Sequence, residues 1–176
     1  AGHTVYNHDG TVKWWNKSLT DGFNAVGNLD DDPYPEIVLI TDRKKIDPGI
    51  LGIKIYLLEH DGNVKWGPVY MKDLDPNRPS GGRTGAPIIA DFDGDGDVEI
   101  GVKGLDYYFI LDRNGNVKNT LSIPYQSDGF YSAPTVFDLN GDSRPEVLIN
   151  SNRYFRIFDG KEGTLLYEEP FGAGFN

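Results

Sequence analysis

The sequence has no cysteine among its 176 residues. Disulfide bonds, thiolate metal sites and cysteine nucleophiles are therefore excluded together. Only three histidines are present, and none has a partner at the spacing of a metal site or a catalytic triad. No apolar run approaches the roughly 18 residues that a membrane-spanning helix needs, and helical periodicity is scarce. These absences favour a protein of short strands and loops. Because the chain begins with Ala1, we expect it to be a processed or excised segment.

Positive charge is also in short supply. The formal net charge is −10 and the isoelectric point is about 4.6, which argues against a nucleic-acid partner because little would neutralise the phosphates. Nearly half of the 27 acidic residues fall in three short segments, 28–36, 91–99 and 138–146. Crowded carboxylates repel one another unless a cation lies among them. We therefore interpret the charge as a set of divalent metal sites.

The three segments share a register that is typical of calcium loops. Calcium takes about 6–8 oxygen ligands, and a tight loop supplies them from every second residue. Positions 1, 3, 5, 7 and 9 give the candidate ligands, with position 7 acting through its backbone carbonyl: Asn28, Asp30, Asp32, Tyr34 and Glu36; Asp91, Asp93, Asp95, Asp97 and Glu99; Asp138, Asn140, Asp142, Arg144 and Glu146. The first loop is the weakest match, because it starts with asparagine and has two prolines in place of glycine. The prediction is up to three structural Ca²⁺ ions.

The EF-hand is the main alternative calcium loop. It needs a bidentate glutamate at position 12 and a helix on each side. Position 12 is Leu39, Val102 or Ile149 here, and each lies inside a strand-like apolar run. The spacing therefore excludes an EF-hand.

A second motif alternates with the acidic loops. Asp-Gly or Asn-Gly pairs stand between apolar runs at Gly10, Gly62 and Gly115, with a looser copy at Gly160. Such pairs are strong hairpin signals because these residues tolerate positive φ. Each unit therefore has four strand candidates, and four short strands in a repeat of roughly 40–50 residues indicate propeller blades. The predicted fold is all-β, a partial β-propeller of about three to four blades of four antiparallel strands.

The repeats are expected to form a single domain over residues 1–176. The full repeats fall at about 17–70, 83–124 and 130–170, and half-repeats fall at 1–16 and 171–176. The first unit is longer, which we attribute to loop insertions around Arg43–Gly52 and Asp73–Gly82. A closed propeller needs at least about four blades, so further blades are expected from the same longer chain or from another chain.

With these loops and flanking strands, the chain resembles the FG-GAP/VCBS repeats of integrin α-type β-propellers from about Thr4 to Asn176. The resemblance implies that each loop joins the two innermost strands of a blade and is stabilised by calcium. The family usually has aspartate at the last loop position, where Glu36, Glu99 and Glu146 stand in this sequence.

The resemblance also implies an extracellular or cell-surface, calcium-binding module for adhesion or for contact with a protein or carbohydrate ligand. Two alternatives stay open. One is part of a polysaccharide-active enzyme similar to the rhamnogalacturonan lyases, using basic residues of the insertions such as Arg78 and Arg83 near calcium. The other is a scaffold subunit of an extracellular assembly or filament. A non-enzymatic role is the favoured interpretation.

The tryptophans divide into a matched pair and a single residue. Trp14 and Trp66 occupy corresponding positions after two of the hairpin turns, so we expect both to pack in the core. Trp15 has no counterpart and is the better surface candidate. Flat aromatic faces also suit sugar rings, which leaves a carbohydrate-stacking platform as the alternative.

Overall fold

The computed structural model describes residues 3–19, 22–41, 44–47, 50–72, 84–104, 107–123, 133–150 and 154–170. Within these ranges the chain forms strands and turns and no helix, and nothing there could cross a membrane as a long apolar helix. The all-β prediction is therefore confirmed. The half-repeat expected at 171–176 and the insertion at Asp73–Gly82 lie outside the described ranges.

The strands form four antiparallel sheets. They are β1 (His3–Tyr6), β2 (Val12–Asn16), β3 (Gly22–Gly27), β4 (Glu36–Thr41), β5 (Lys44–Asp47), β6 (Ile50–Leu58), β7 (Val64–Lys72), β8 (Ile88–Ala90), β9 (Glu99–Lys103), β10 (Tyr107–Leu111), β11 (Val117–Ser122), β12 (Thr135–Phe137), β13 (Glu146–Asn150), β14 (Tyr154–Asp159) and β15 (Leu165–Pro170). Sheet 1 is the hairpin β1-β2, sheet 2 contains β3 to β7, sheet 3 contains β8 to β11, and sheet 4 contains β12 to β15. Sheets 2, 3 and 4 each contain a four-stranded meander in chain order, with β7 following β6 in sheet 2.

The first insertion differs from the sequence expectation. Residues Arg43–Gly52 were expected to form a loop, but β5 lies within them and pairs with the start of β6, where Lys44 is opposite Gly52 and Asp47 is opposite Ile50. Ile46, Ile50 and Leu51 favour extended backbone. The segments on both sides of the Pro-Gly pair therefore pair as strands, and β6 extends to nine residues.

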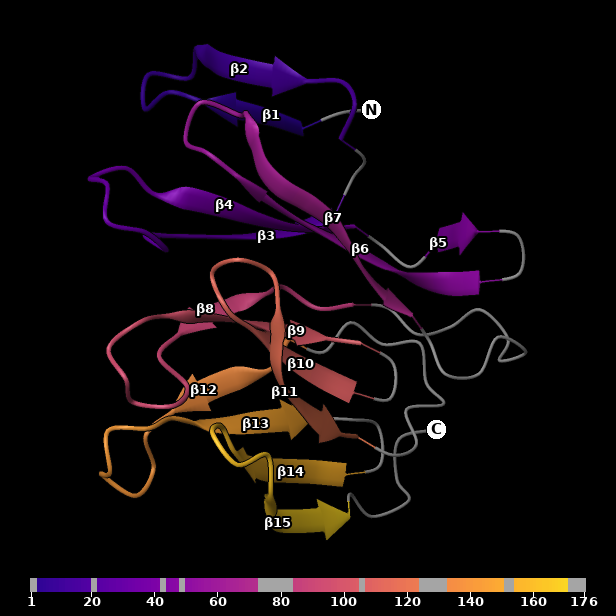
Figure 1. The fold of residues 1–176 in the computed structure, drawn as a ribbon, viewed down its shortest axis with the longest axis vertical. Helices are drawn as coiled ribbons and strands as arrows, with labels where there is room; N and C mark the ends of the chain where they lie inside the picture. Colours follow the sequence, from indigo (N-terminus) through magenta and orange to yellow (C-terminus); the bar gives the residue numbers. More distant parts are fainter. Residues whose placement is uncertain are drawn as a thin grey trace.

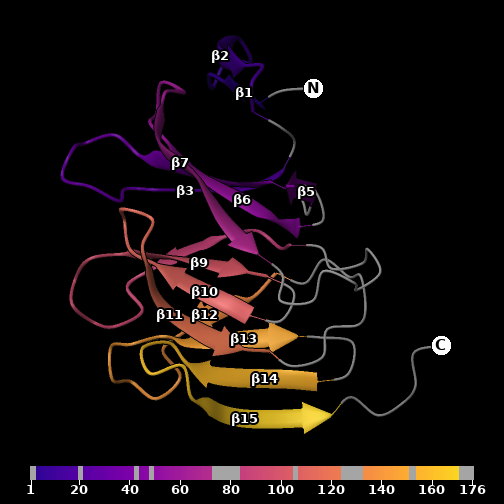
Figure 2. The same ribbon diagram turned by 45° about the vertical axis from the view of Figure 1, so that its right-hand side comes forward.

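The sheets stack on one another along the long axis of the molecule (Figures 1 and 2). Because sheet 2 is covered on both faces, its second strand contains a continuous apolar run. In β4, Val38, Leu39 and Ile40 are fully buried. One core cluster joins sheets 2 and 3, a second joins sheets 3 and 4, and a third joins the hairpin to sheet 2.

The tryptophans follow the sequence prediction. Trp14 packs against the cluster between sheets 1 and 2, and Trp66 packs against the cluster between sheets 2 and 3. Trp15 is 56% exposed. The matched pair is therefore part of the core and the unmatched tryptophan is on the surface, as predicted.

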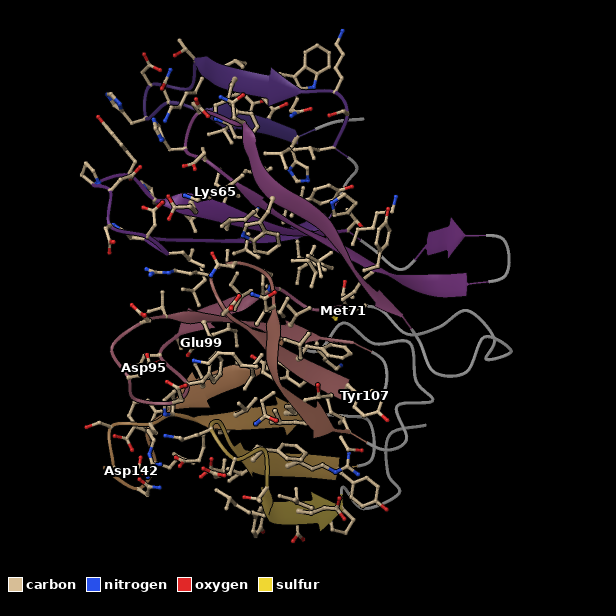
Figure 3. All side chains as sticks on the ribbon, viewed as in Figure 1. Lys65, Met71, Asp95, Glu99, Tyr107 and Asp142 are labelled. Atoms are coloured by element: carbon tan, nitrogen blue, oxygen red, sulfur yellow. The ribbon has the colours of Figure 1, made fainter. Side chains whose placement is uncertain are left out.

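Meander topology determines where the acidic loops lie. In a four-stranded meander, the turn between strands 1 and 2 and the turn between strands 3 and 4 lie at the same end of the sheet. Each acidic loop therefore lies beside the hairpin turn of its own sheet. Figure 3 shows Asp95, Asp142 and Glu99 toward one side of the stack, and Met71 and Tyr107 toward the other.

Candidate metal-binding loops

The three acidic loops, loop 1 (28–36), loop 2 (91–99) and loop 3 (138–146), share one hydrogen-bond framework. The position-5 carboxylate accepts the backbone N–H of position 7 in each, from Tyr34 to Asp32 at 2.7 Å, from Asp97 to Asp95 at 2.9 Å, and from Arg144 to Asp142 at 2.9 Å. The position-3 side chain accepts the N–H of position 5 in the same way. The loops therefore curl alike although their sequences differ.

Position 1 separates loop 1 from the other two. Asp91 accepts the N–H groups of Gly94 at 2.7 Å and Gly96 at 2.9 Å with its two carboxylate oxygens. Asp138 holds loop 3 in the same way. Asn28 instead accepts the N–H of Asp30 at 3.2 Å and donates to the Asp32 carbonyl at 2.8 Å. Loops 2 and 3 therefore wrap around their first carboxylate, whereas an amide holds loop 1.

The position-9 glutamates are buried at the first residue of β4, β9 and β13. Glu36 is 0%, Glu99 2% and Glu146 3% exposed. A buried carboxylate is costly unless its oxygens are paired. In every loop one oxygen, Oε2, accepts the backbone N–H of position 2, at 2.7 Å, 2.9 Å and 2.7 Å in loops 1, 2 and 3. This contact fixes the two ends of each loop to one another.

The second oxygen of the glutamate has a different partner in each loop. Glu99 Oε1 accepts from the Lys118 ammonium at 2.9 Å. Glu146 Oε1 accepts from the Asn140 side-chain amide at 3.0 Å. Glu36 Oε1 is buried and has no hydrogen-bond partner among the described residues. Loop 1 therefore has a desolvated carboxylate oxygen that only an added cation or donor would satisfy.

Loop 1 is also where the largest acidic group forms. Carboxylate oxygens of Asp30, Asp32, Glu36 and Glu59 all lie within 4.8 Å of one another. Lys65 approaches this group and pairs with Asp30 and with Glu59, the latter at 2.9 Å. The hydrogen bond from Lys65 holds the pKa of Asp30 below its ordinary value. One ammonium cannot neutralise four carboxylates, so the group keeps a net negative charge.

Loop 2 contains a smaller acidic group that one lysine enters. Oxygens of Asp93, Glu99 and Asp91 lie within 4.8 Å of one another. Lys118 Nζ is 2.6 Å from Asp93 Oδ2 and 3.5 Å from Asp95 Oδ2. The hydrogen bond from Lys118 lowers the pKa of Asp93, whereas burial raises the pKa of Glu99 against the opposing effect of the same lysine. The ammonium therefore supplies positive charge to this acidic group.

A β-bulge directs both lysines toward their loops. In sheet 2, Leu57 pairs with Trp66 but Leu58 pairs with Val64, which leaves Lys65 as the extra residue. In sheet 3 the same shift leaves Lys118 between Val117 and Asn119. A bulge turns a side chain away from the regular alternation of its strand. Each lysine can therefore reach the acidic loop at the same end of its sheet.

Loop 3 lacks a lysine because the corresponding bulge residue is Leu166. Its position-7 side chain, Arg144, instead pairs with Asp142 at 3.0 Å. The hydrogen bond from the Arg144 backbone N–H lowers the pKa of Asp142, and it contributes more than the charge of the Arg144 side chain does. The carboxylates of this loop do not form a compact group of three among the described residues. Loop 3 thus has the shared framework but the smallest concentration of charge.

The structure brings together six of the fifteen ligand residues that the sequence indicates, and adds Glu59, which it does not indicate. Positions 3 and 9 of loops 1 and 2 lie close together in the two acidic groups, and none of the position-7 side chains joins them. Their carbonyl role therefore stays a prediction. Glu59, Lys65 and Lys118 were missed. The signal was present: an acidic or amide residue opens every hairpin, and a Val-Lys pair closes three of them.

Comparison with known proteins finds similarity in structure but none in sequence. No family model matches the chain, and no curated protein matches it. The structure is similar to that of the V. cholerae biofilm matrix protein Bap1, with a TM-score of 0.64 and 15% identity. The match covers 97% of this chain and 52% of that one, so the chain spans about half the length of the protein it resembles. The similarity shows a shared all-β fold.

Proposed function

We propose that this chain is a calcium-binding module of an extracellular protein and that calcium stabilises its loops. The observation that carries the proposal is the oxygen of Glu36 that has no partner. It is fully buried, its carboxylate lies in a group with three further carboxylates, and it belongs to a loop framework that occurs three times. A divalent cation would satisfy this oxygen and offset the repulsion within the group.

The chemistry of the donors favours calcium over other metals. The acidic groups offer carboxylate oxygens, and the chain has no cysteine, so soft metals that prefer thiolates have no ligands. Calcium accepts irregular sets of about 6–8 oxygens, whereas magnesium demands near-octahedral geometry and retains water. The loops mix carboxylates, amides and backbone carbonyls over a short curled segment. Such a set suits calcium.

The sheet stack supports a propeller of the FG-GAP/VCBS type. Each of sheets 2 to 4 contains a four-stranded meander with its acidic loop between the first two strands. The first strands lie side by side, because β8 contacts both β3 and β12. Blades of a propeller are arranged in this way around their axis. On this proposal, sheets 2, 3 and 4 are blades and sheet 1 is half of one.

An extracellular location agrees with the metal and with the structural match. Extracellular calcium modules bind calcium with dissociation constants of roughly 0.1–1 mM, which suits loops as exposed as these. The similarity to a biofilm matrix protein points the same way. The proposed role is adhesion or matrix contact through a protein or carbohydrate ligand. Support for the polysaccharide-active alternative is lacking among the described residues, and its basic candidates Arg78 and Arg83 lie outside them.

The test is to titrate calcium into the chelator-treated protein by calorimetry, with thermal melts in calcium and in chelator. At about a hundredfold excess over the dissociation constant, each site adds about 2.7 kcal/mol to the free energy of unfolding. For a domain of this size, the melting temperature would rise by roughly 5–10 °C per site. The absence of both heat and a thermal shift would refute the proposal.

Two matched variants locate the binding. Glu36→Gln keeps the shape of the side chain but removes the charge from the oxygen that has no partner, so calcium affinity should fall at least about tenfold at one site. Glu162→Gln makes the same change on an exposed hairpin turn of sheet 4 and should bind calcium as the wild type does. Equal losses in the two variants would mean that net charge, and not loop 1, governs binding.

A further inference from the structure

A carboxylate from outside the loop enters the acidic group of loop 1. Glu59 opens the hairpin turn between β6 and β7. The residue before it, Leu58, pairs with Ile37 of β4. Since β4 begins at Glu36, strand pairing brings Glu59 beside this buried glutamate. Like charges at neighbouring cross-strand positions destabilise a sheet, so the pair is costly unless a cation or a set of donors offsets the repulsion.

The corresponding residue is an aspartate in sheets 3 and 4, where it serves the hairpin turn. Asp112 accepts the backbone N–H groups of Asn114 and Asn116, each at 2.8 Å. Asp159 accepts the backbone N–H of Glu162 at 2.6 Å. Hydrogen bonds to an ionised acceptor are among the stronger ones in proteins. Both aspartates therefore fix their own turns.

Sheet 2 divides these tasks between two residues. Asp61 fixes its turn, because the carboxylate accepts the backbone N–H and the side-chain amide of Asn63 at 3.0 Å and 2.8 Å. Glu59 has a side chain one methylene longer than that of aspartate, and its carboxylate joins the acidic group of loop 1. The presence of Asp61 and the greater reach of Glu59 therefore distinguish sheet 2 from sheets 3 and 4.

Two further contacts hold the hairpin against loop 1. The His60 ring stacks on the Tyr34 ring, with the centroids 4.2 Å apart and the planes at 20°. Lys65 pairs with Asp30 of loop 1 and with Glu59 of the hairpin, the latter at 2.9 Å. Figure 3 shows Lys65 on the side of the stack where the acidic loops lie. A single cation therefore already bridges the two segments.

One ammonium leaves this bridge incomplete. Lys65 brings one positive charge to four carboxylates, and Oε1 of Glu36 is buried with no hydrogen-bond partner among the described residues. The Lys65 side chain is 32% exposed, so it can turn toward solvent without rearranging the core. A divalent cation between the two segments would bring twice the charge and would coordinate oxygens from both.

We propose that calcium in loop 1 is held by two segments of the chain, with the Glu59 carboxylate as a direct ligand from the hairpin turn. The ion takes the place of the Lys65 ammonium between Asp30 and Glu59, and it binds the oxygen of Glu36 that has no partner. Calcium therefore ties the start of β4 to the β6–β7 hairpin. This role of Glu59 rests on the proposed calcium function, but it can fail while calcium still binds in the loops.

Glu59→Gln tests the direct contact, because it keeps the length of the side chain and removes the charge. Calorimetric titration of calcium into the chelator-treated 176-residue chain should show an affinity at least about tenfold weaker at one site. Glu162→Gln makes the same change on the exposed hairpin turn of sheet 4 and should bind calcium as the wild type does.

Glu59→Asp separates reach from charge. It keeps the negative charge but is one methylene shorter, and the aspartate at the corresponding position of sheet 3, Asp112, bonds to its own turn. A direct ligand role predicts a loss of affinity comparable to that of Glu59→Gln. Binding at the wild-type level in Glu59→Asp would mean that only the charge of the carboxylate matters, and would overturn the proposal.

The double variant Glu36→Gln/Glu59→Gln shows whether both residues bind one ion. If they do, the double variant loses binding at the same single site as either single variant, and the remaining sites bind as in the wild type. Loss of binding at two sites would place Glu59 at a different ion and would refute its role in loop 1.

Thermal melts separate a ligand from a residue that supports the fold. In chelator, Glu59→Gln should melt at or above the temperature of the wild type, because it removes one of four carboxylates that repel one another. In saturating calcium it should melt lower. An equal fall in both buffers would show that Glu59 supports the fold and does not bind the ion.

Failure of this role is distinguishable from failure of the proposed function. A wild type that binds no calcium would refute both. Calcium binding that is present in the wild type and unchanged in Glu59→Gln would refute the role of Glu59 alone.

Discussion

Lys118 acts as the counter-cation of loop 2, and replacing it should leave the repulsion among the carboxylates of that loop without an offset. Its Nζ lies 2.6 Å from Asp93, 2.9 Å from Glu99 and 3.5 Å from Asp95. The hydrogen bond to Asp93 raises the pKa of Lys118 above its ordinary value, so the ammonium stays charged throughout the neutral range. Calcium bound in this loop would compete with the ammonium for the same oxygens.

Lys118→Met keeps the aliphatic stem and removes the charge. Removing one partner of a buried ion pair costs about 3–5 kcal/mol, and an exposed pair contributes about 0–1 kcal/mol. Glu99 is 2% exposed but the Lys118 side chain is 35% exposed, so the expected loss lies between these limits, at about 2 kcal/mol in calcium-free buffer. For a chain of this size this corresponds to a fall in melting temperature of roughly 4–8 °C.

The same substitution should strengthen calcium binding, although it lowers the stability of the calcium-free protein. Because the ion no longer displaces an ammonium, loop 2 of the variant should bind calcium about thirtyfold more tightly, the equivalent of the same 2 kcal/mol. The assay is denaturant unfolding in chelator and in saturating calcium, together with calorimetry. Lys13→Met is the matched control, because Lys13 is the corresponding bulge residue of sheet 1 and should change neither quantity appreciably.

Two results would refute this reasoning. If Lys118→Met is as stable as the wild type in chelator, the ammonium does not offset the repulsion of the carboxylates. If the variant binds calcium more weakly, the lysine assists the metal site and does not compete with it.

The remaining predictions concern the sheet contacts and one buried lysine. Trp66→Ala removes the ring over Gly115 and the hydrogen bond to the Arg113 carbonyl, and should lower the free energy of unfolding by about 3 kcal/mol. Trp15→Ala should change the free energy of unfolding by less than about 0.5 kcal/mol. Equal effects of the two substitutions would contradict the core role of Trp66. Burial lowers the pKa of Lys103 to about 8. Between that pH and the ordinary lysine pKa, the unfolded chain therefore binds more protons than the folded chain does. The free energy of unfolding should rise by about 2 kcal/mol from pH 7 to pH 10. Lys103→Met should flatten this rise, and an unchanged slope in the variant would show that other groups cause it.

Much of the fold could be predicted from the sequence, because the relevant signals are local. Gly62 and Gly115 mark tight turns with positive φ, and the apolar runs before them become strands. The run at Ile37–Ile40 is apolar at every residue, which identifies a strand covered on both faces. The strand β5 was missed because a Pro-Gly pair in a segment rich in charge is the usual signal of a loop.

The site was only partly predictable, because its cations come from other strands. Loop spacing identifies Asp30 and Glu36 as neighbours, but Glu59 lies 23 residues beyond Glu36 in the sequence and joins the group only through the pairing of β4 with β6. Lys65 and Lys118 reach their loops because each stands at a β-bulge, and a bulge is a property of strand pairing. Loop 1 was the weakest match because it starts with asparagine and has two prolines in place of glycine, although the structure gives it the largest acidic group.

The most direct test of the central claim is a crystal structure of the protein grown in calcium, with anomalous differences measured to identify the ion. We predict a peak in loop 1 at about 2.3–2.6 Å from Glu36 Oε1, with Asp30 and Asp32 oxygens among its neighbours. A map with no peak at that oxygen, under calcium that saturates the crystal, would contradict the assignment of the loops as calcium sites.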